Sequence, residues 1–366
     1  MRPPSPLRPA FADAGAAFAV ADGVERATRV AGLEVEYRAV REHVGVGDLS
    51  DLGRIRVAGE AARDALDGLL AGNVQNLPEN AMRGTVALGE DGRILAQTTV
   101  HCLFDEYLLT TDGDSRGALL GLLEAGMPAG VRVADLSDSH GMLRVDGPDA
   151  ADLPRALFGL EAAGLRLMSL ATCRLDGAEV IVSRIGSTGE YGYTLMAERD
   201  ALPEILERLR RLVPDAALCG SDAYDVLLLE MRSFNRRRDL PHDEPLLAAG
   251  LHWMIDFRKP AFVGRDAVLA AKKRGLQRRM VCVRLDRGAP VPAPDAVVRL
   301  ERRAVGYVAH AAFSLALAAP IGLAYLDASC AVVGLPVTVD TRGGPAAART
   351  VSAPFVRTRS NAGRSG

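Results

Sequence analysis

The chain reads Asp48-Leu-Ser-Asp-Leu-Gly-Arg-Ile-Arg-Val-Ala-Gly59, and the same pattern returns with one inserted residue as Asp135-Leu-Ser-Asp-Ser-His-Gly-Met-Leu-Arg-Val-Asp-Gly147. Each copy leads into a segment rich in Ala and Asp that favours a helix. Two copies are too few for a solenoid, which needs about three stacked units. The repeat therefore predicts two related α/β lobes, and such lobes more often enclose a ligand at their junction than inside either one.

Helix and strand signals alternate around the repeat. Apolar residues at helical spacing predict one helix over Ala62–Leu70 and another over Leu202–Val213. Runs of β-branched residues between Gly-rich turns predict strands over Glu179–Ser183 and Tyr193–Leu195.

The pattern changes after about residue 275 to short strands at close intervals. We expect these strands over Met280–Leu285, Ala296–Leu300, Ala304–Ala309, Ile321–Tyr325 and Pro336–Asp340. Gly, Pro and Asp turns separate them, which is typical of a small β-barrel or sandwich. The basic run Lys272–Arg279 stands at the change and is expected to be a solvated linker.

These signals divide the chain into four parts. Residues 1–29 are expected to be a partly flexible N-terminal extension, 30–275 the two lobes, 276–356 the barrel, and 357–366 a disordered tail. The predicted fold class is α+β, with two duplicated α/β lobes and a C-terminal β-barrel. No chemistry is expected in either end of the chain.

The composition disfavours several classes of protein. The 366 residues include 44 Lys and Arg against 46 Asp and Glu, so the net charge of −2 disfavours a nucleic-acid partner. The five cysteines are scattered without a CxxC pattern, which favours reduced thiols in a cytoplasmic protein over disulfides. No segment approaches the run of about 18 apolar residues that a membrane span needs.

Most catalytic motifs are missing from the sequence. It contains no P-loop, no GxSxG elbow, no HExxH and no GxGxxG that opens a βαβ unit. The six histidines are widely separated, so we expect no metal site.

Two segments carry candidate ligand-binding groups. Gly186-Ser-Thr-Gly-Glu-Tyr-Gly-Tyr193 combines glycines with Glu190 and two tyrosines, which suits a planar ligand, although a tight β-hairpin is the simpler interpretation. Arg232-Ser-Phe-Asn-Arg-Arg-Arg-Asp239 offers guanidinium groups for a carboxylate-bearing ligand, and a solvated face explains it at least as well.

Taken in order, these segments resemble the aminomethyltransferase family, which comprises the glycine-cleavage T-protein and related folate-dependent demethylases. The resemblance covers about residues 30 to 356. Its landmarks are Tyr37, Arg41-Glu-His43, Asp48-Leu-Ser50, Gly92-Arg-Ile-Leu95, Val145-Asp-Gly-Pro148, Thr188-Gly-Glu-Tyr-Gly-Tyr193, Leu227-Leu-Leu-Glu230, Pro245, Gly250-Leu-His-Trp253, Lys259-Pro-Ala-Phe-Val-Gly-Arg265, Gly306-Tyr-Val308, Ile321-Gly-Leu-Ala-Tyr325 and Pro354-Phe-Val356.

The resemblance implies a ring of three domains with tetrahydrofolate in its central opening. It also implies roles for particular residues. Gln97, Thr99 and Tyr37 would serve the reacting end, Ser187, Glu190, Tyr193 and Thr194 the pterin, Arg232 and Arg236 the glutamate tail, and Trp253 the cofactor more generally.

Four key polar positions depart from the family pattern. The paired aspartates are Ala96-Gln97, the leading Tyr of the Tyr-Thr-Gly-Glu motif is Ser187, the second pteridine-binding Glu is Thr194, and the Arg of the Leu-Arg-Leu-Glu segment is Leu228. A glutamine or a threonine offers only neutral hydrogen bonds where a carboxylate would hold charge. The departures predict a demethylase-like methyl or one-carbon transferase that acts on a small donor, and not glycine cleavage itself.

Two alternatives stay open at this point. The first is an enzyme of another reaction class that keeps the ring and has lost folate binding, because one fold can host several chemistries. The second is a non-catalytic role resembling that of family members in iron–sulfur cluster assembly. It ranks last, because the region Trp253–Arg265 lacks the cysteine of their signature.

Overall fold

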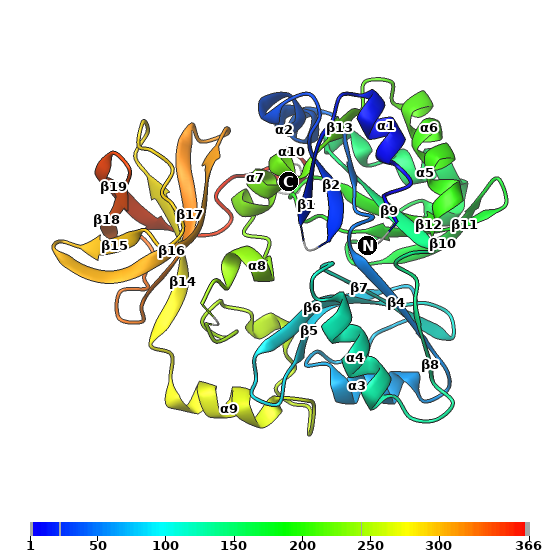
Figure 1. Cartoon of the computed structure of the whole chain (residues 1–366), viewed down its shortest axis with the longest axis horizontal. Coiled ribbons are helices and arrows are strands. Elements are labelled where there is room, and N and C mark those ends of the chain that lie inside the picture. Colours follow the sequence, from blue (N-terminus) through cyan, green and yellow to red (C-terminus); the bar gives the residue numbers. More distant parts are fainter. Residues whose placement is uncertain (1–2, 22, 243, 363–366) are drawn as a thin grey trace.

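The protein is described by a computed structural model of the chain, which covers residues 3–21, 23–242 and 244–362. Two lobes and a barrel are arranged around the short helix α8 (Arg236–Asp239) (Figure 1). The predicted fold class is confirmed. No helix among the described residues is long and apolar enough to cross a membrane.

The six-stranded lobe is built on a sheet of strand order β10-β11-β12-β9-β3-β13. Helices α1 (Arg8–Asp13), α5 (Leu153–Phe158) and α6 (Leu202–Leu212) pack on it and share one apolar core. The strands are β3 (Gly45–Asp48), β9 (His140–Asp146), β10 (Leu170–Leu175), β11 (Ala178–Arg184), β12 (Gly192–Glu198) and β13 (Ala217–Cys219). The strands and the helix predicted in this region are confirmed.

The five-stranded lobe has the strand order β5-β6-β7-β4-β8. Helices α3 (Ala62–Leu69) and α4 (Arg116–Gly126) bury their apolar sides against it. The strands are β4 (Gly53–Ala58), β5 (Met82–Leu88), β6 (Ile94–Cys102), β7 (Glu106–Thr111) and β8 (Arg132–Asp135).

The sequence repeat forms a crossing between the two lobes. In the first copy β3 leads into β4, and in the second β8 leads into β9, while β3 pairs with β9 and β4 pairs with β8. The Ser50 hydroxyl accepts from the Met142 N–H at 3.2 Å, and the Ser137 hydroxyl accepts from the Arg54 N–H at 2.9 Å. Each copy therefore supplies one strand to each sheet, instead of building one lobe alone as the sequence suggested.

The remaining helices join the lobes to each other and to the barrel. Helix α2 (Leu33–Glu42) packs against α7 (Ser221–Glu230), and α7 also contacts the barrel strand β16 (Arg303–Ser314). The connecting elements are the hairpin β1 (Ala17–Ala21) and β2 (Val24–Arg29), helices α2 (Leu33–Glu42), α7 (Ser221–Glu230), α9 (Arg265–Arg274) and α10 (Arg359–Ala362), and the 3-10 turns Pro148–Ala150, Gly159–Ala162, Arg199–Ala201 and His252–Met254.

The C-terminal barrel is closed by strands in the order β14-β17-β16-β15-β18-β19. Its strands are β14 (Arg278–Leu285), β15 (Val297–Leu300), β16 (Arg303–Ser314), β17 (Ala319–Asp327), β18 (Pro336–Thr341) and β19 (Gly344–Val351). The five predicted strands are confirmed. The sixth, β19, was missed because its Ala-rich sequence has low strand propensity.

The basic run was only partly a linker. Lys272, Lys273 and Arg274 form the last turn of α9, where cations favourably meet the helix C-terminus, and Arg278 already begins β14. The run is solvated as expected, but only Gly275–Gln277 connects the two elements.

The described parts of both chain ends pack against the rest of the protein, which differs from the expected flexible extension and disordered tail. Leu7 and Phe11 are fully buried in the core of the six-stranded lobe, so residues 1–29 are not a loose extension in their described part. At the other end Thr358 is buried and Ser360 bonds to Glu190, so the start of the expected disordered tail is docked. Residues 1–2 and 363–366 lie outside the described residues, and the domain boundaries at 30, 276 and 357 stay predictions.

Candidate functional site

A central cavity of ≈ 650 Å³ lies where the lobes and the barrel meet. Gln97 and Thr99 of β6 line it from the five-stranded lobe, and Arg144 of β9 lines it from the six-stranded lobe. Its other walls come from α7 and α8, from the segment Ala249–Met254, and from the barrel residues Met280 and Leu323. The repeat thus predicted the location of the cavity correctly, at the junction of the lobes.

The hairpin of β6 and β7 forms the wall that carries Gln97. Thr98 pairs with Thr111, which sets Asp112 across from Gln97 just past the end of β7. The Thr111 hydroxyl donates a 2.7 Å hydrogen bond to the Gln97 carbonyl oxygen and holds the strands in this register. Asp112 lines the central cavity together with Gln97 and Thr99.

A recess of ≈ 160 Å³ extends the cavity between the two sheets. Tyr193 and Thr194 of β12 line it, and Gln97, Thr99 and Asp112 belong to both hollows. His101 also lines the recess, and complete burial lowers the pKa of its imidazole to about 4. The ring is therefore neutral at physiological pH and offers no positive charge to a ligand.

Arg144 and Asp146 form a buried ion pair beside the recess. Two bonds of 2.7 and 2.9 Å join the Arg144 guanidinium to the Asp146 carboxylate, and a third of 3.0 Å runs from Arg144 to the Ser187 hydroxyl. The Ser187 carbonyl oxygen accepts a bond from the Ser233 hydroxyl. Ser187 is thus fixed at the cavity wall, where the resemblance placed a cofactor contact.

The segment after α7 brings two arginines to the cavity wall. Arg232 donates to the Ala249 carbonyl oxygen at 3.2 Å, and no carboxylate among the described residues lies within ion-pair distance of it. Arg238 is paired with Asp225 at 2.5 Å. Arg232 therefore keeps an uncompensated positive charge at the cavity, which suits an anionic group of a ligand.

Trp253 stands at the rim of the central cavity. It is 67% exposed and packs beside Gly84, and it also lines a second hollow of ≈ 580 Å³ with Phe257 and Arg258. An indole in this position can cover the aromatic part of a ligand that extends out of the cavity.

Three of the residues expected in the site line neither the central cavity nor its recess. The Tyr37 hydroxyl donates to the buried Glu230 carboxylate at 2.8 Å, and burial with the nearby Glu230 raises the pKa of Tyr37 to about 12. The Arg41 guanidinium donates a 2.7 Å hydrogen bond to the same carboxylate. Tyr37 thus belongs to a buried network between α2 and α7, and this position does not support the catalytic role expected of it.

Glu190 also has a structural partner instead of the cofactor. Its carboxylate accepts from the Ser360 hydroxyl at 2.6 Å and from the Ser360 N–H at 3.0 Å. Arg236 is engaged too, since it pairs with Asp114 at 2.7 Å and lines a separate hollow of ≈ 200 Å³. The expected roles of Glu190 at the pterin and of Arg236 at the glutamate tail are therefore not supported by their positions.

The donor set of the cavity fits tetrahydrofolate. A folate combines a polar pterin, an aromatic ring and glutamate carboxylates, and a cavity of ≈ 650 Å³ is in the usual range for a ligand of this size. Arg232 offers a guanidinium that has no carboxylate partner among the described residues, and the Asp112 carboxylate has no partner among them either. Apolar contacts for the rings come from Met168, Leu228 and Phe234.

Asp112 is the residue that sequence reasoning missed. Counting back equally along both strands from the turn at Phe104–Asp105 gives the pairing of Gln97 with Asp112, so the signal was present in the hairpin. The bonds that fix Ser187, from the Arg144 guanidinium and from the Ser233 hydroxyl, had no such signal, because they join segments far apart in the chain. Among the described residues no group of three or more His, Cys, Asp or Glu could hold a metal ion.

Comparisons with known proteins cover nearly the whole chain. The GCVT N-terminal domain family matches residues 7–259, and the glycine cleavage T-protein C-terminal barrel domain matches residues 278–357. An aminomethyltransferase of Parafrankia sp. is 34% identical over 96% of this chain and 97% of that protein. Another, of Picosynechococcus sp., is 31% identical over 96% of this chain and 98% of its own length.

A solved structure is similar over the same extent. The glycine cleavage system aminomethyltransferase T from Bartonella henselae superposes with a TM-score of 0.89 at 25% identity, and the match covers 98% of this chain and 99% of that chain.

Proposed function

Because this chain belongs to the aminomethyltransferase family, we propose that it transfers a methyl or other one-carbon group from a small donor to tetrahydrofolate and does not carry out glycine cleavage. Members of the family are transferases that depend on tetrahydrofolate. The observation that carries the proposal is the central cavity, which Gln97 lines at its polar end and which the Arg232 guanidinium also lines.

Tetrahydrofolate, when bound, supplies a nucleophilic ring nitrogen that forms the new bond to carbon, while the donor heteroatom keeps the electron pair of the broken bond and the nitrogen's proton leaves. The chain's own residues bind and orient. Arg232 would hold the glutamate carboxylate, Trp253 would cover the aromatic ring, and Ser187, Tyr193 and Thr194 would contact the pterin. Gln97 and Thr99 would align the donor by neutral hydrogen bonds.

The same wall supports the proposed departure from glycine cleavage. Ala96 is buried and Gln97 faces the cavity, so neither position of β6 offers the carboxylate that the family pattern has there. Sulfonium, quaternary ammonium and ether donors need alignment with the folate nitrogen more than they need that carboxylate.

Product analysis tests the proposal. The protein is incubated without oxygen with tetrahydrofolate and, in separate reactions, a sulfonium, a quaternary ammonium and a methyl ether donor, and 5-methyltetrahydrofolate is measured. We expect the product with at least one donor. Methylenetetrahydrofolate and ammonia from an aminomethyl-lipoyl donor at a comparable rate would instead support glycine cleavage.

A second candidate function is an enzyme of another reaction class that has lost folate binding. It is favoured by Thr194 and Leu228, which stand where the family pattern has a pterin-binding carboxylate and an arginine. Failure of tetrahydrofolate to bind would support this candidate. For either function we propose a cytoplasmic location, because Cys102, Cys173, Cys219, Cys282 and Cys330 are all free and buried.

A further inference from the structure

Asp112 holds a distinctive place in the cavity wall. It follows β7 directly, lies across from Gln97 in the hairpin register, and lines both the central cavity and its recess. A group on a ligand that contacts the Gln97 side chain would therefore also come near the Asp112 carboxylate.

The other carboxylates of the cavity are already engaged. Asp48 accepts the Ser50 N–H at 2.8 Å, and Asp239 accepts the Asn235 N–H at 2.8 Å. Asp225 is bound to Arg238, and Asp51 lies 4.0 Å from Arg26. The Asp112 carboxylate, in contrast, has no hydrogen bond or ion pair to any of the described residues.

The charges that act on Asp112 leave it in a negative environment. Asp114 on the same loop and Asp51 on the β3–β4 loop repel it, while Arg236 and Arg238 of α8 attract it. Both arginines form ion pairs with other carboxylates, Arg236 with Asp114 and Arg238 with Asp225. Burial and the two aspartates raise the pKa of Asp112 from 3.8 to about 6.

We infer that Asp112 supplies the carboxylate of the reacting end, from the strand beside the one that carries Gln97, and that it faces a positively charged one-carbon donor. This inference rests on the proposed function. A cation placed between Gln97 and Asp112 relieves the unpaired negative charge, whereas a neutral donor leaves it without a partner. Asp112 would thus select cationic donors over neutral ones of the same shape.

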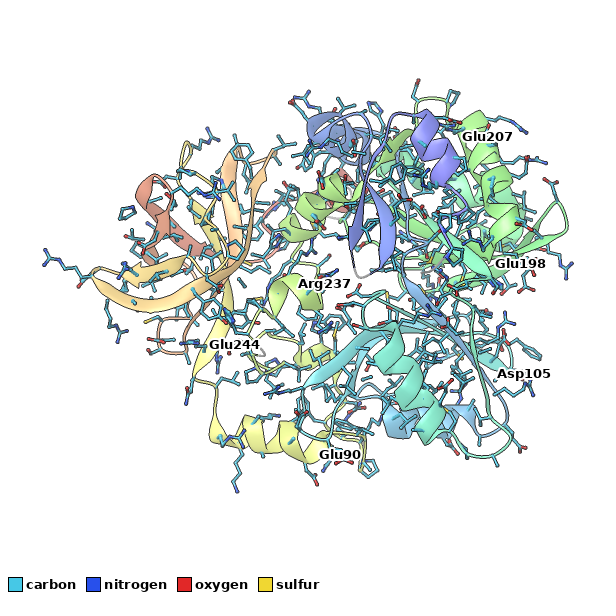
Figure 2. All side chains as sticks on the ribbon, viewed as in Figure 1. Glu90, Asp105, Glu198, Glu207, Arg237 and Glu244 are labelled. Atoms are coloured by element: carbon cyan, nitrogen blue, oxygen red, sulfur yellow. The ribbon has the colours of Figure 1, made fainter. Side chains whose placement is uncertain are left out.

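The test uses a pair of molecules that differ only in charge. Choline and its uncharged isostere 3,3-dimethylbutan-1-ol are titrated into the folate-free protein at pH 7.5, for the wild type and for Asp112→Asn. Asp105→Asn is the matched control, because Asp105 is exposed at the far tip of the same hairpin (Figure 2). A rescue variant, Gln97→Asp with Asp112→Asn, moves the carboxylate across the hairpin.

We expect the wild type and Asp105→Asn to bind choline at least about 10-fold more tightly than the isostere. Asp112→Asn should lose most of this preference without weakening the isostere, and the rescue variant should regain it. In the wild type the affinity for choline should also fall as the pH drops through about 6.

Equal binding of both probes by the wild type would overturn the inference, and so would an unchanged preference in Asp112→Asn. A loss of tetrahydrofolate affinity in Asp112→Asn with the preference intact would assign the carboxylate to the cofactor instead. Failure of the wild type to bind tetrahydrofolate would count against the proposed function alone, because the charge preference is read on folate-free protein.

Discussion

The Gln97 carbonyl oxygen accepts a 2.7 Å hydrogen bond from the Thr111 hydroxyl across the hairpin of β6 and β7. This bond reinforces the register that sets Asp112 beside Gln97 at the cavity. The two residues together form a wall with one neutral amide and one carboxylate that has no partner in the described part of the chain. Catalytic sites often keep such groups at a cost to the stability of the fold.

The stability of Asp112→Asn should reveal that cost. The pKa of Asp112 in the folded protein, about 6, lies above its ordinary value of 3.8, so ionisation disfavours the folded state. The stabilisation by the protonated form is complete below pH 3.8 and is lost as the pH rises through about 6. We expect Asp112→Asn to raise the free energy of unfolding by about 1–2 kcal/mol at pH 8 and by almost nothing near pH 3.5. Denaturant titrations at several pH values measure this, and a destabilised variant at pH 8 would show that the carboxylate has a structural partner.

Arg232 should contribute to the affinity for tetrahydrofolate by binding the glutamate carboxylate. Arg232→Gln removes the charge but keeps a side chain that can still donate to the Ala249 carbonyl oxygen. We expect the dissociation constant of tetrahydrofolate to rise about 10- to 100-fold, since a hydrogen bond to a charged group contributes about 1.5–3 kcal/mol. Calorimetric titration measures it.

Arg236→Gln serves as the control for this prediction, because Arg236 is paired with Asp114 away from the central cavity. It should bind tetrahydrofolate as the wild type does. A tetrahydropteroate ligand, which lacks the glutamate, should bind the wild type and Arg232→Gln alike. A weaker complex with Arg236→Gln than with Arg232→Gln would reverse the assignment.

The docked C-terminal segment should contribute to stability. Ser360→Ala removes the 2.6 Å bond to the buried Glu190 carboxylate and the acceptor of the Tyr191 N–H. We expect a loss of about 1–3 kcal/mol, because a buried charge is left with fewer partners. Arg357→Ala, an exposed site three residues earlier, should stay within about 0.5 kcal/mol of the wild type. Thermal and denaturant unfolding compare them, and equal stability of the two variants would mean that the segment is not held by Glu190.

The fold could be predicted from the sequence where local patterns decide it. The strand over Glu179–Ser183 and the helix from Leu202 follow from periodicity and Gly-rich turns. The crossing of the repeat could not be predicted, because it depends on contacts between the two copies. Ser50 of the first copy bonds to Met142 of the second, and Ser137 of the second bonds to Arg54 of the first. The ends were misjudged for a similar reason, since Phe11 owes its burial to distant residues and not to its Pro-rich neighbours.

The site could be predicted in part. Gln97, Thr99, Ser187, Arg232 and Trp253 do line the central cavity, and Tyr193 and Thr194 line its recess. Tyr37, Glu190 and Arg236 do not, because each is bound to a partner that lies far away in the sequence. A motif gives the residue type at a position, but the competing partners of a charged side chain are set by the tertiary structure.

Titration of the purified wild-type protein with tetrahydrofolate, without oxygen and under reducing conditions, decides whether the central cavity binds a folate. We expect saturable binding by calorimetry and a stabilisation of about 2.7 kcal/mol at a concentration 100 times the dissociation constant. No heat of binding and no rise in the melting temperature at millimolar tetrahydrofolate would contradict it.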